Sequence, residues 1–598
     1  MVGTTISHYK VLEKIGEAVW ERCIGHLDRV FSPQSSDTGG LMRRRYTMLF
    51  STSILALVLA TCVGLAEPSP SEEESACAAL TDIRNLTITS ADVRKVDEAL
   101  ASRLGYDVVR YCYVKGNIAP AIRFHVQLPL PQNWNGRFLK QGDGGKDGDL
   151  DFFDHRVVEG YAVANSNTGH DSGAEPRSTF GYNNRQAEID FGYRAVHLTA
   201  NAAKTVIDAY YDQAPEYSYF EGCSTGGMQA MTEAQRFPYD FDGIVAGDPG
   251  FFYQALNISH VWYLQRMFLN DYAGMLAYDR DGDGAFDSIR KLEMLAEAVM
   301  AKCDANDGIS DSVIDNPLAC DFDPDVDLAR MMCARDVNAD GCFTTAQLQT
   351  IKDFYGGAHD SKGVSILNGK AFGTELDWAG RYIPYEGNSF RASQLGTSGD
   401  HINYLFYETD PGVAMQDLSD PSLAPDKNQI PPEWSLWEFN IDDFTAGKGD
   451  LMRSITDAID PDLTRFHSKN GGKMILYTGW ADPSPPAARL IDYYNEVVAT
   501  TFAGDLETTK ENLRLFLLPG MGHCRGGAGP NIWDKLAPLV DWVENGNAPD
   551  FVVATHSTDG VVDNERRICA YPELAVYTGP VGGENDPANW VESNFTCQ

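Results

Sequence analysis

The stretch from Tyr217 to Gly227 contains a serine whose neighbours could make it a nucleophile. Ser224 lies between Gly222 and Gly226 in the order G-x-S-x-G, after a short aromatic run and before a segment of helical character. Glycines at these two places permit a sharp strand-to-helix turn, which would present the serine hydroxyl to a histidine. A flexible glycine turn is the alternative explanation. The expected strand before the motif and the helix after it favour a nucleophile.

Two more residues could complete a site for acyl transfer. Asp482 follows an apolar segment that begins at Gly472, and His523 follows the apolar segment 513–518. Each comes just after the carboxyl end of an expected strand, where open α/β sheets gather their chemistry. The order serine, acid, histidine is the one that α/β-hydrolases use. His523 would be the general base and Asp482 would orient it, although singly such residues are more often a turn aspartate and a structural histidine.

Acyl transfer also needs donors for the oxyanion. The backbone N–H of Thr225, directly after the serine, is the expected first donor. The second is expected from the glycine-rich loop 142–145, with Gly144 and Gly145 as candidates. Asp143 interrupts this loop, and its charge would be unfavourable unless the side chain points away. A plain surface turn is the alternative for the loop.

The cysteines next to the serine and the histidine link these motifs. Cys223 immediately precedes Ser224, and Cys524 immediately follows His523. If the serine and the histidine are hydrogen-bonded, the two cysteines come close enough for a disulfide. Two buried free thiols, ordinary in a cytosolic enzyme, are the alternative.

The pattern Cys223-Ser224, Asp482 and His523-Cys524 resembles the CS-D-HC arrangement of the tannase and feruloyl esterase family. Four surrounding segments agree with this resemblance: 128–139, 237–247, 477–483 and 519–524. Members of that family hydrolyse galloyl esters, hydroxycinnamoyl esters or the mono-hydroxyethyl ester of terephthalate. The resemblance runs from about residue 77 to the C-terminus.

The resemblance implies an α/β-hydrolase fold with a large inserted lid domain. We expect core in residues 67–250, the lid in 251–465 and core again in 466–598. The implied function is a secreted serine esterase that cleaves small aromatic esters through an acyl-enzyme. Feruloyl esters rank first, galloyl esters second and the terephthalate monoester third. A non-catalytic binding protein on a hydrolase scaffold is the alternative from another class, and the intact serine, aspartate and histidine count against it.

The resemblance also implies a structural calcium site in the lid. Its ligands would be the side chains of Asp304, Asp307 and Asp311 and the carbonyls of Ile309 and Val313. Packed carboxylates repel one another unless a cation neutralises them, and Ca²⁺ accepts such oxygen ligands. A solvated acidic turn is the alternative.

Two further acidic segments resemble the opening of an EF-hand loop. The first contains Asp279, Asp281, Asp283 and Asp287, and the second contains Asp336, Asn338 and Asp340. Arg290 and Gln347 occupy the places of the closing glutamate, so both segments lack the bidentate ligand. Metal binding there stays open.

Cysteine usage indicates an oxidising compartment. Ten of the twelve cysteines lie in the region of family resemblance, and no C-x-x-C pair occurs. Proximity and the resemblance suggest five pairs: Cys223–Cys524, Cys303–Cys320, Cys333–Cys342, Cys77–Cys112 and Cys569–Cys597.

The N-terminal region has the features of an export signal. Arginines at 43–45 precede an apolar run that ends near Ala66, which predicts a signal peptide over 42–66 and a secreted or periplasmic protein. Cys62 is a weaker candidate for lipidation. Residues 1–41 begin with a stretch similar to the first strand of a protein kinase but lack the later kinase motifs. We interpret them as a vestigial or misassigned extension.

The overall charge restricts the partners. A net charge of −37 argues against nucleic-acid or anionic-membrane binding, so no stable membrane association is expected. Most aromatic side chains of the insertion should form its core, and a few could line an acyl pocket. Arg391 could contact a substrate carboxylate or form an ordinary surface salt bridge. The sequence leaves the oligomeric state open.

Overall fold

The structure, a computed structural model, describes residues 71–106, 109–385, 392–407 and 437–598. Residues 70–598 form one compact unit. Four features expected from the sequence lie outside the described residues: the extension 1–41, the signal 42–66, Cys62 and Arg391.

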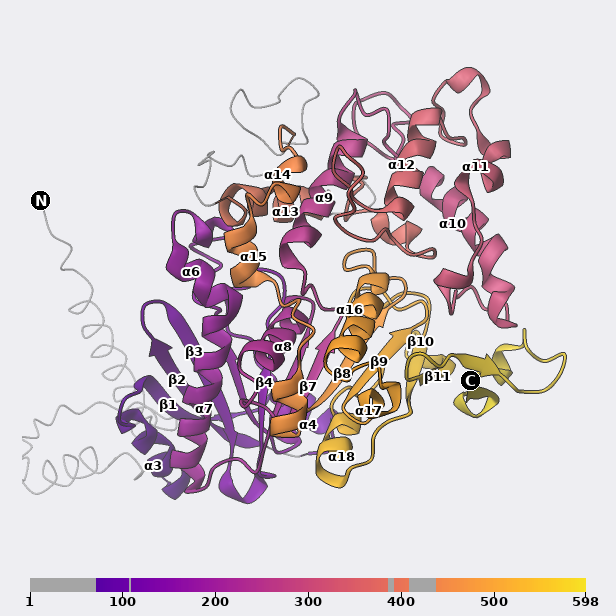
Figure 1. The fold of residues 1–598 in the computed structure, drawn as a ribbon. Helices are drawn as coiled ribbons and strands as arrows, with labels where there is room; N and C mark the ends of the chain where they lie inside the picture. The colour runs from indigo at the N-terminus through magenta and orange to yellow at the C-terminus, as the bar shows by residue number, and fades with distance from the viewer. Residues whose placement is uncertain (1–70, 107–108, 386–391, 408–436) are drawn as a thin grey trace, which may run out of the picture. The chain divides into compact units, whose positions relative to one another are not determined.

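A nine-stranded sheet forms the centre of this unit, in the order β1-β2-β3-β5-β4-β6-β7-β8-β9 (Figure 1). Its strands are β1 (Thr87–Lys95), β2 (Arg110–Ile118), β3 (Ile122–Pro129), β4 (Arg137–Gln141), β5 (Ala162–Ser166), β6 (Tyr217–Cys223), β7 (Gly243–Gly247), β8 (Lys473–Gly479) and β9 (Leu513–Leu518). Pairing is antiparallel from β1 to β5 and parallel from β5 to β9. Two short antiparallel pairs follow, β10 (Phe551–Thr558) with β11 (Val561–Cys569) and β12 (Ala575–Tyr577) with β13 (Phe595–Cys597).

Helices precede, connect and follow these strands. Those outside the insertion are α3 (Glu72–Ala79), α4 (Glu98–Arg103), α5 (Asp154–Val158), α6 (Arg185–Ile189), α7 (Ala195–Tyr211), α8 (Thr225–Arg236), α16 (Ala487–Thr500), α17 (Leu506–Lys510) and α18 (Ala537–Asn545). Those between β7 and β8 are α9 (Tyr253–Phe268), α10 (Arg290–Cys303), α11 (Pro324–Asp327), α12 (Thr345–Gly356), α13 (Ser393–Leu405), α14 (Asp442–Thr445) and α15 (Asp450–Thr456).

The sheet supplies two hydrophobic cores, because successive side chains of a strand point to opposite faces. Phe220 of β6 belongs to one core together with Val206 of α7, and its neighbour Tyr219 belongs to the other together with Trp542 of α18. Helices α7, α8 and α16 contact the strands on the first side, and α18 contacts β7 and β8 on the second. The result is a sheet covered by helices on both faces, as the predicted α/β-hydrolase fold requires.

The chain leaves the sheet after β7 and returns to it at β8. The described residues between these two strands contribute nothing to the nine-stranded sheet. Helix α9 packs there against α12, α13 and α15, and Figure 1 shows α10, α11 and α12 grouped together. The side chains of Trp378, Tyr382 and Phe406 are fully buried in this insertion. The residues expected to form the lid, 251–465, lie within it.

Among the described residues, no helix combines the length and apolar character needed to cross a bilayer.

Candidate active site

Ser224 makes the whole turn between β6 and α8. Strand β6 ends at Cys223 and helix α8 begins at Thr225. The serine has φ 63° and ψ −119°, a conformation that side-chain-bearing residues rarely adopt and that is typical of functional sites. Its N–H donates to the Gly247 carbonyl at 2.9 Å, and its carbonyl accepts from the Gly250 N–H at 3.1 Å. These bonds hold the turn against its strain.

Glycine is required at several positions here because the backbone segments lie too close together to leave room for a side chain. A Cβ on Gly222 would lie 2.4 Å from the Gly226 carbonyl oxygen. A Cβ on Gly142 would lie 2.7 Å from the Gly226 Cα. Both distances are far below van der Waals contact, so larger residues would displace the backbone. The glycine-rich loop therefore packs directly against the turn that carries the serine.

The three side chains singled out from the sequence lie in one hydrogen-bonded row. The distance from His523 Nε2 to Ser224 Oγ is 2.8 Å, and that from His523 Nδ1 to Asp482 Oδ2 is 2.6 Å. The Asp482 side chain is fully buried, whereas that of His523 is 22% exposed. The second oxygen of Asp482 accepts the Ser484 N–H at 2.7 Å. The row thus runs from a buried carboxylate to the hydroxyl of Ser224, a residue of intermediate exposure.

The charges in this row suit proton transfer. Burial works to raise the pKa of Asp482, but His523 and then Arg381 outweigh it and hold that pKa below its usual value. Burial works to lower the pKa of His523, but Asp482 and then Asp248 outweigh it and raise that pKa. The aspartate therefore stays ionised while the imidazole gains a proton, which is what a general base requires.

Two groups of backbone amides lie near the serine. Thr225 is the first residue of α8, so its N–H has no acceptor within the helix. The loop 142–145 packs against the same helix start, and a Cβ on Gly144 or Gly145 would meet no atom within 4 Å. The space beside these two glycines is therefore open.

Asp143 is engaged inside the protein. Its N–H donates to Gln229 Oε1 at 3.0 Å, so this amide is occupied. Its carboxylate accepts from Asn165 Nδ2 at 2.7 Å and from Gln229 Nε2 at 3.2 Å. Burial, partly offset by Lys140, raises the pKa of Asp143 to about 6. The side chain is only 3% exposed, which removes the objection that its charge faces the oxyanion.

The structure contains the five expected disulfides. Cys223–Cys524 joins the residue before the serine to the residue after the histidine, with a Cα–Cα distance of 6.0 Å across 301 positions of sequence. The others are Cys77–Cys112, Cys303–Cys320, Cys333–Cys342 and Cys569–Cys597.

Three charged residues near the row were not singled out from the sequence. Asp248 follows β7 directly, so the strand-end rule that identified Asp482 could have found it. Arg381 and Lys370 come from the insertion, and no periodic pattern marks them. Lys370 Nζ donates to the Tyr382 hydroxyl at 2.9 Å, and burial lowers the pKa of this lysine to about 7.

The expected calcium ligands form a loop between Asp304 and Asp315, hereafter the acidic loop. The short helix η5 (Asp304–Asp307) opens it. One carboxylate oxygen of each expected ligand accepts a loop amide: Asp304 from Ser312 at 3.0 Å, Asp307 from Ile309 at 3.0 Å and Asp311 from Val313 at 3.1 Å. The second oxygens are thereby fixed in direction.

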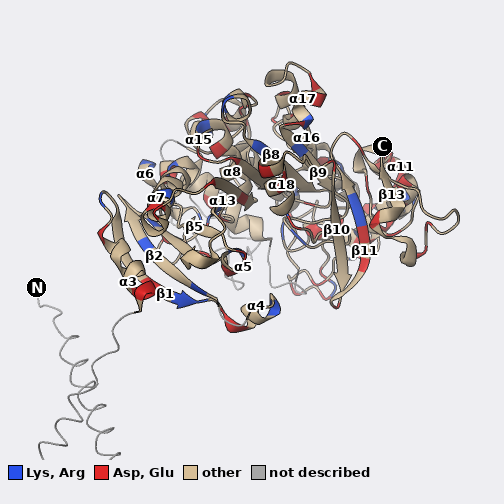
Figure 2. Ribbon diagram, turned by 90° about the horizontal axis from the view of Figure 1, so that it is seen from below, with Lys and Arg blue, Asp and Glu red and all other residues tan. Residues whose placement is uncertain are grey.

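Negative charge in the acidic loop is only partly neutralised by the protein. Arg566 of β11, a strand with charges of both signs (Figure 2), contacts Asp311 and Asp315 at 2.5 Å each. Asp307 Oδ2 and Asp315 Oδ1 are buried without a hydrogen-bond partner. Burial and then Asp315 raise the pKa of Asp307 to about 8. Of the expected ligands, Asp307 keeps a buried oxygen free for a cation, whereas the second oxygen of Asp311 is bonded to Arg566.

The two EF-hand-like segments differ in their contacts. Oxygens of Asp279, Asp281 and Asp283 come within 4.8 Å of one another, but these residues are largely exposed, as acidic groups without an ion commonly are. Asp340 pairs with Arg280 at 2.8 Å and accepts from the Ser288 hydroxyl at 2.6 Å. These contacts engage both carboxylate oxygens of Asp340.

Comparison with known proteins identifies the family of the chain. A sequence model described as tannase and feruloyl esterase matches residues 106–590. The chain is 31% identical over 580 residues to mono(2-hydroxyethyl) terephthalate hydrolase of Piscinibacter sakaiensis, covering 88% of this chain and 92% of that one. It is 30% identical over 542 residues to feruloyl esterase B of Aspergillus niger, covering 85% and 93%.

Solved structures share the fold. The crystal structure of feruloyl esterase B from Aspergillus oryzae matches with a TM-score of 0.70 at 22% identity, covering 88% of this chain and 100% of that one. A tannin acyl hydrolase from Aspergillus niger matches with a TM-score of 0.66 at 23% identity, covering 88% and 94%. The predicted α/β-hydrolase fold is thereby confirmed. The chain belongs to the tannase and feruloyl esterase family and is a carboxylic ester hydrolase.

Proposed function

We propose that the protein is a secreted serine esterase that releases aromatic acids, with hydroxycinnamoyl esters such as feruloyl esters as its preferred substrates. The observation that carries the proposal is the hydrogen-bonded row of Ser224, His523 and Asp482, hereafter the catalytic row. The names of the two similar relatives, a feruloyl esterase and a terephthalate monoester hydrolase, both denote esters of aromatic acids. The five disulfides favour an oxidising compartment.

In the acylation step, Ser224 Oγ attacks the ester carbonyl carbon while His523 Nε2 takes the hydroxyl proton. The carbonyl oxygen becomes an oxyanion, which the N–H groups of Thr225 and of Gly144 or Gly145 stabilise. His523 then gives its proton to the leaving oxygen as the carbon–oxygen bond breaks. The alcohol departs and the acyl group stays on the serine.

Deacylation repeats the same proton transfers with water. His523 takes a proton from a water molecule, whose oxygen attacks the acyl carbon. The second tetrahedral intermediate collapses, the proton returns to Ser224 Oγ, and the aromatic acid is released. Asp482 orients the imidazole and stabilises its positive charge throughout.

A cavity that includes Trp480 and Ala481, directly before Asp482, but not Ser224 or His523, is a candidate site for an aromatic ring. It measures about 700 Å³ and lies between core residues such as Trp480 and insertion residues such as Phe372 and Leu376. These side chains offer apolar surface to a phenyl ring. Glu375 and Asp377 also line it. For a substrate whose ring enters this cavity, carboxylates in the wall disfavour a further carboxylate, which ranks phenolic esters above the terephthalate monoester.

One observation favours the terephthalate monoester as a second candidate. Arg381 of the insertion lies close enough to Asp482 and His523 to influence the pKa of each. A guanidinium at that distance could pair with the free carboxylate of a monoester, since arginine binds carboxylates through two parallel hydrogen bonds.

Hydrolysis of methyl ferulate, methyl gallate and mono(2-hydroxyethyl) terephthalate would test both candidates. We expect the highest kcat/KM for methyl ferulate and a loss of about 10³-fold or more in Ser224→Ala. Arg381→Gln should lower kcat/KM for the monoester but not for methyl ferulate if the arginine binds a carboxylate. Absence of hydrolysis of all three esters and of a nitrophenyl ester by the parent would favour a non-catalytic binding protein.

We also propose that the acidic loop binds a structural calcium ion. The side chains of Asp304, Asp307 and Asp311 and the carbonyls of Ile309 and Val313 would hold it. Calcium would supply positive charge to a loop in which Arg566 neutralises only part of the negative charge. The ion has no role in the proton transfers.

A further inference from the structure

Asp248 is a buried carboxylate that the proposed mechanism does not use. It directly follows β7, is 0% exposed and has φ 36°, in the left-handed region. Its N–H donates to the Tyr477 carbonyl of β8 at 2.8 Å. The preceding Gly247 accepts the Ser224 N–H at 2.9 Å. Asp248 thus lies where the serine turn meets the strand that leads to Asp482.

The two carboxylate oxygens of Asp248 accept hydrogen bonds from two separate segments of the chain. Oδ1 accepts from the Thr478 hydroxyl at 3.0 Å and from the Gly479 N–H at 2.8 Å, at the end of β8. Oδ2 accepts from the Cys524 N–H at 3.0 Å, directly after the histidine. One carboxylate therefore ties the segment that carries the catalytic acid to the segment that carries the catalytic base.

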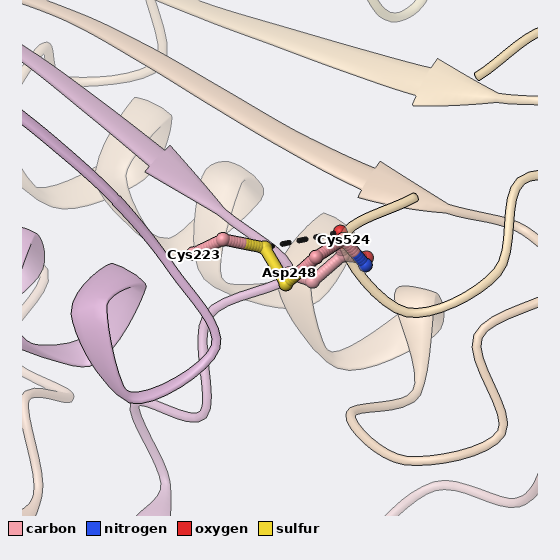
Figure 3. A group of neighbouring side chains, drawn as sticks. All are labelled: Cys223, Asp248 and Cys524. Atoms are coloured by element: carbon pink, nitrogen blue, oxygen red, sulfur yellow. Dashed lines mark hydrogen bonds between the residues drawn. A yellow bond between two sulfur atoms is a disulfide. The ribbon is translucent and has the colours of Figure 1, made fainter. Parts of the chain in front are cut away.

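Figure 3 shows Asp248 beside the Cys223–Cys524 disulfide. The distance from Cys223 Sγ to Asp248 Oδ2 is 3.6 Å, a packing contact because a disulfide sulfur has no proton to donate. Cys524 has φ 65°, a conformation that needs support from its surroundings. The disulfide anchors the side chain of Cys524 and Asp248 anchors its N–H. Both contacts therefore fix the position of Cys524, the residue next to His523.

We propose that Asp248 is a positioning residue of the esterase, a second carboxylate that works with Asp482 to hold and stabilise His523. The inference rests on the proposed catalytic row. One ligating atom from each of Asp248, Asp482 and His523 lies within 4.8 Å of the others. Asp482 contacts the imidazole directly, and Asp248 acts through the Cys524 amide and through its charge.

The charges around Asp248 agree with this role. Burial and then Asp482 raise the pKa of Asp248 to about 7, whereas His523 works to lower it. Formation of the imidazolium therefore favours the ionised form of Asp248 at the moment when its charge is useful. Lys535 also lies near Asp248. Arg381 of the insertion works against this effect, because it lowers the pKa of His523.

Asp248→Asn keeps the size of the side chain and removes its charge. We expect kcat to fall about 10- to 100-fold, as for a lost hydrogen bond to a charged group, with KM changed less than about threefold. The acidic limb of the pH profile of kcat/KM should move to lower pH, because a charge that raises the pKa of His523 is gone. A purely structural role would not move that limb.

Asp457→Asn is the matched control. Asp457 is also a buried aspartate whose pKa burial raises to about 7, and its Oδ1 accepts the Gln254 N–H at 3.0 Å. This control should keep the parental pH profile. Thr478→Val serves if Asp248→Asn does not fold. It removes one donor to Asp248 and should shift the acidic limb in the same direction by a smaller amount.

The outcomes separate this inference from the proposed function. Parental kcat and an unmoved acidic limb in Asp248→Asn, with Ser224→Ala inactive, would overturn the role of Asp248 alone. If Asp248→Asn does not fold, an unmoved limb in Thr478→Val would do the same. Parental activity in Ser224→Ala would overturn both proposals. Hydrogen exchange gives an independent check, since the Cys524 amide should exchange faster in folded Asp248→Asn and at the parental rate in Asp457→Asn.

Discussion

The catalytic row and the acidic loop both hold sequestered aspartates, but their charges are balanced in different ways. Asp482 faces an imidazole and a backbone amide, and its pKa lies below the usual value despite burial. Asp307 faces other carboxylates, and burial and then Asp315 raise its pKa to about 8. Asp482 is thus kept ionised in the catalytic row, whereas the raised pKa of Asp307 favours binding of a proton or a cation in the acidic loop.

The difference shows that the partners of a buried carboxylate, rather than burial itself, decide its charge. In the proposed mechanism, the negative charge of Asp482 stabilises the imidazolium of His523 during each proton transfer. In the acidic loop the excess charge is available to bind an ion. Variants that remove a carboxylate or a disulfide from one region, and removal of calcium, can test the comparison.

The largest expected effect is on catalysis. Asp482→Asn should lower kcat by about 10⁴-fold, because the imidazole loses the group that fixes its tautomer and stabilises its charge. Asp307→Asn should leave kcat within about threefold of the parent, since the acidic loop takes no part in proton transfer. Steady-state hydrolysis of methyl ferulate measures both. A comparable loss in both variants would mean that the two regions are not functionally distinct.

The disulfide beside the catalytic row should affect activity, whereas the disulfide beside the acidic loop should affect stability. Replacing Cys223 and Cys524 by serine should lower kcat by about 10-fold or more while the folded state persists, because the histidine segment loses one anchor. Cys303 directly precedes the acidic loop and Cys320 follows it. Replacing these two cysteines should lower the melting temperature without a comparable change in kcat. Kinetics and thermal melting of the two double variants would distinguish a loss of activity from a loss of stability. Activity that is lost only together with the fold would contradict a local role for Cys223–Cys524.

Calcium removal should affect stability alone. At a calcium concentration of about 100 times Kd, binding stabilises the folded state by about 2.7 kcal/mol, so chelation should lower Tm by a few degrees. Asp307→Asn should show little dependence of Tm on calcium or chelator. Calorimetry with and without a chelator provides the measurement. An identical parental Tm in the two conditions would show that the acidic loop binds no calcium.

A further effect is expected on the pH dependence of stability. Without calcium, the folded state keeps a proton on Asp307 up to about pH 8, whereas the unfolded chain releases it near its usual pKa of about 3.9. Stability should therefore decrease as pH rises between those two values. Asp482 has a lowered pKa, so its contribution is present above the unfolded pKa and is lost on acidification. Asp307→Asn should flatten the decline towards pH 8 and leave the acid-induced loss unchanged; an unaltered slope would contradict the assignment.

The sequence by itself determined the fold class, the family and the members of the catalytic row. The family and the inserted lid rest on a resemblance of motifs, whereas the serine turn and the strand ends follow from local physics. The glycines at 222 and 226 permit a turn that other residues would block, and the strands before Asp482 and His523 end where a parallel sheet brings its loops together. The Cys223–Cys524 pair was suggested by the family resemblance and by the positions of the two cysteines beside Ser224 and His523.

Only the tertiary structure decided what surrounds these residues. Arg566 reaches Asp311 from a strand more than two hundred positions away, and no local pattern announces that contact. The cavity wall near Trp480 combines one face of α10 with insertion residues such as Phe372 and Gly373, and no local pattern shows that these segments meet. Asp248 stands at a strand end in the sequence, but its bonds to Gly479 and Cys524 appear only after three separate segments pack together. Periodicity and turn chemistry are properties of neighbouring residues, whereas the partners of a buried charge come from the whole chain.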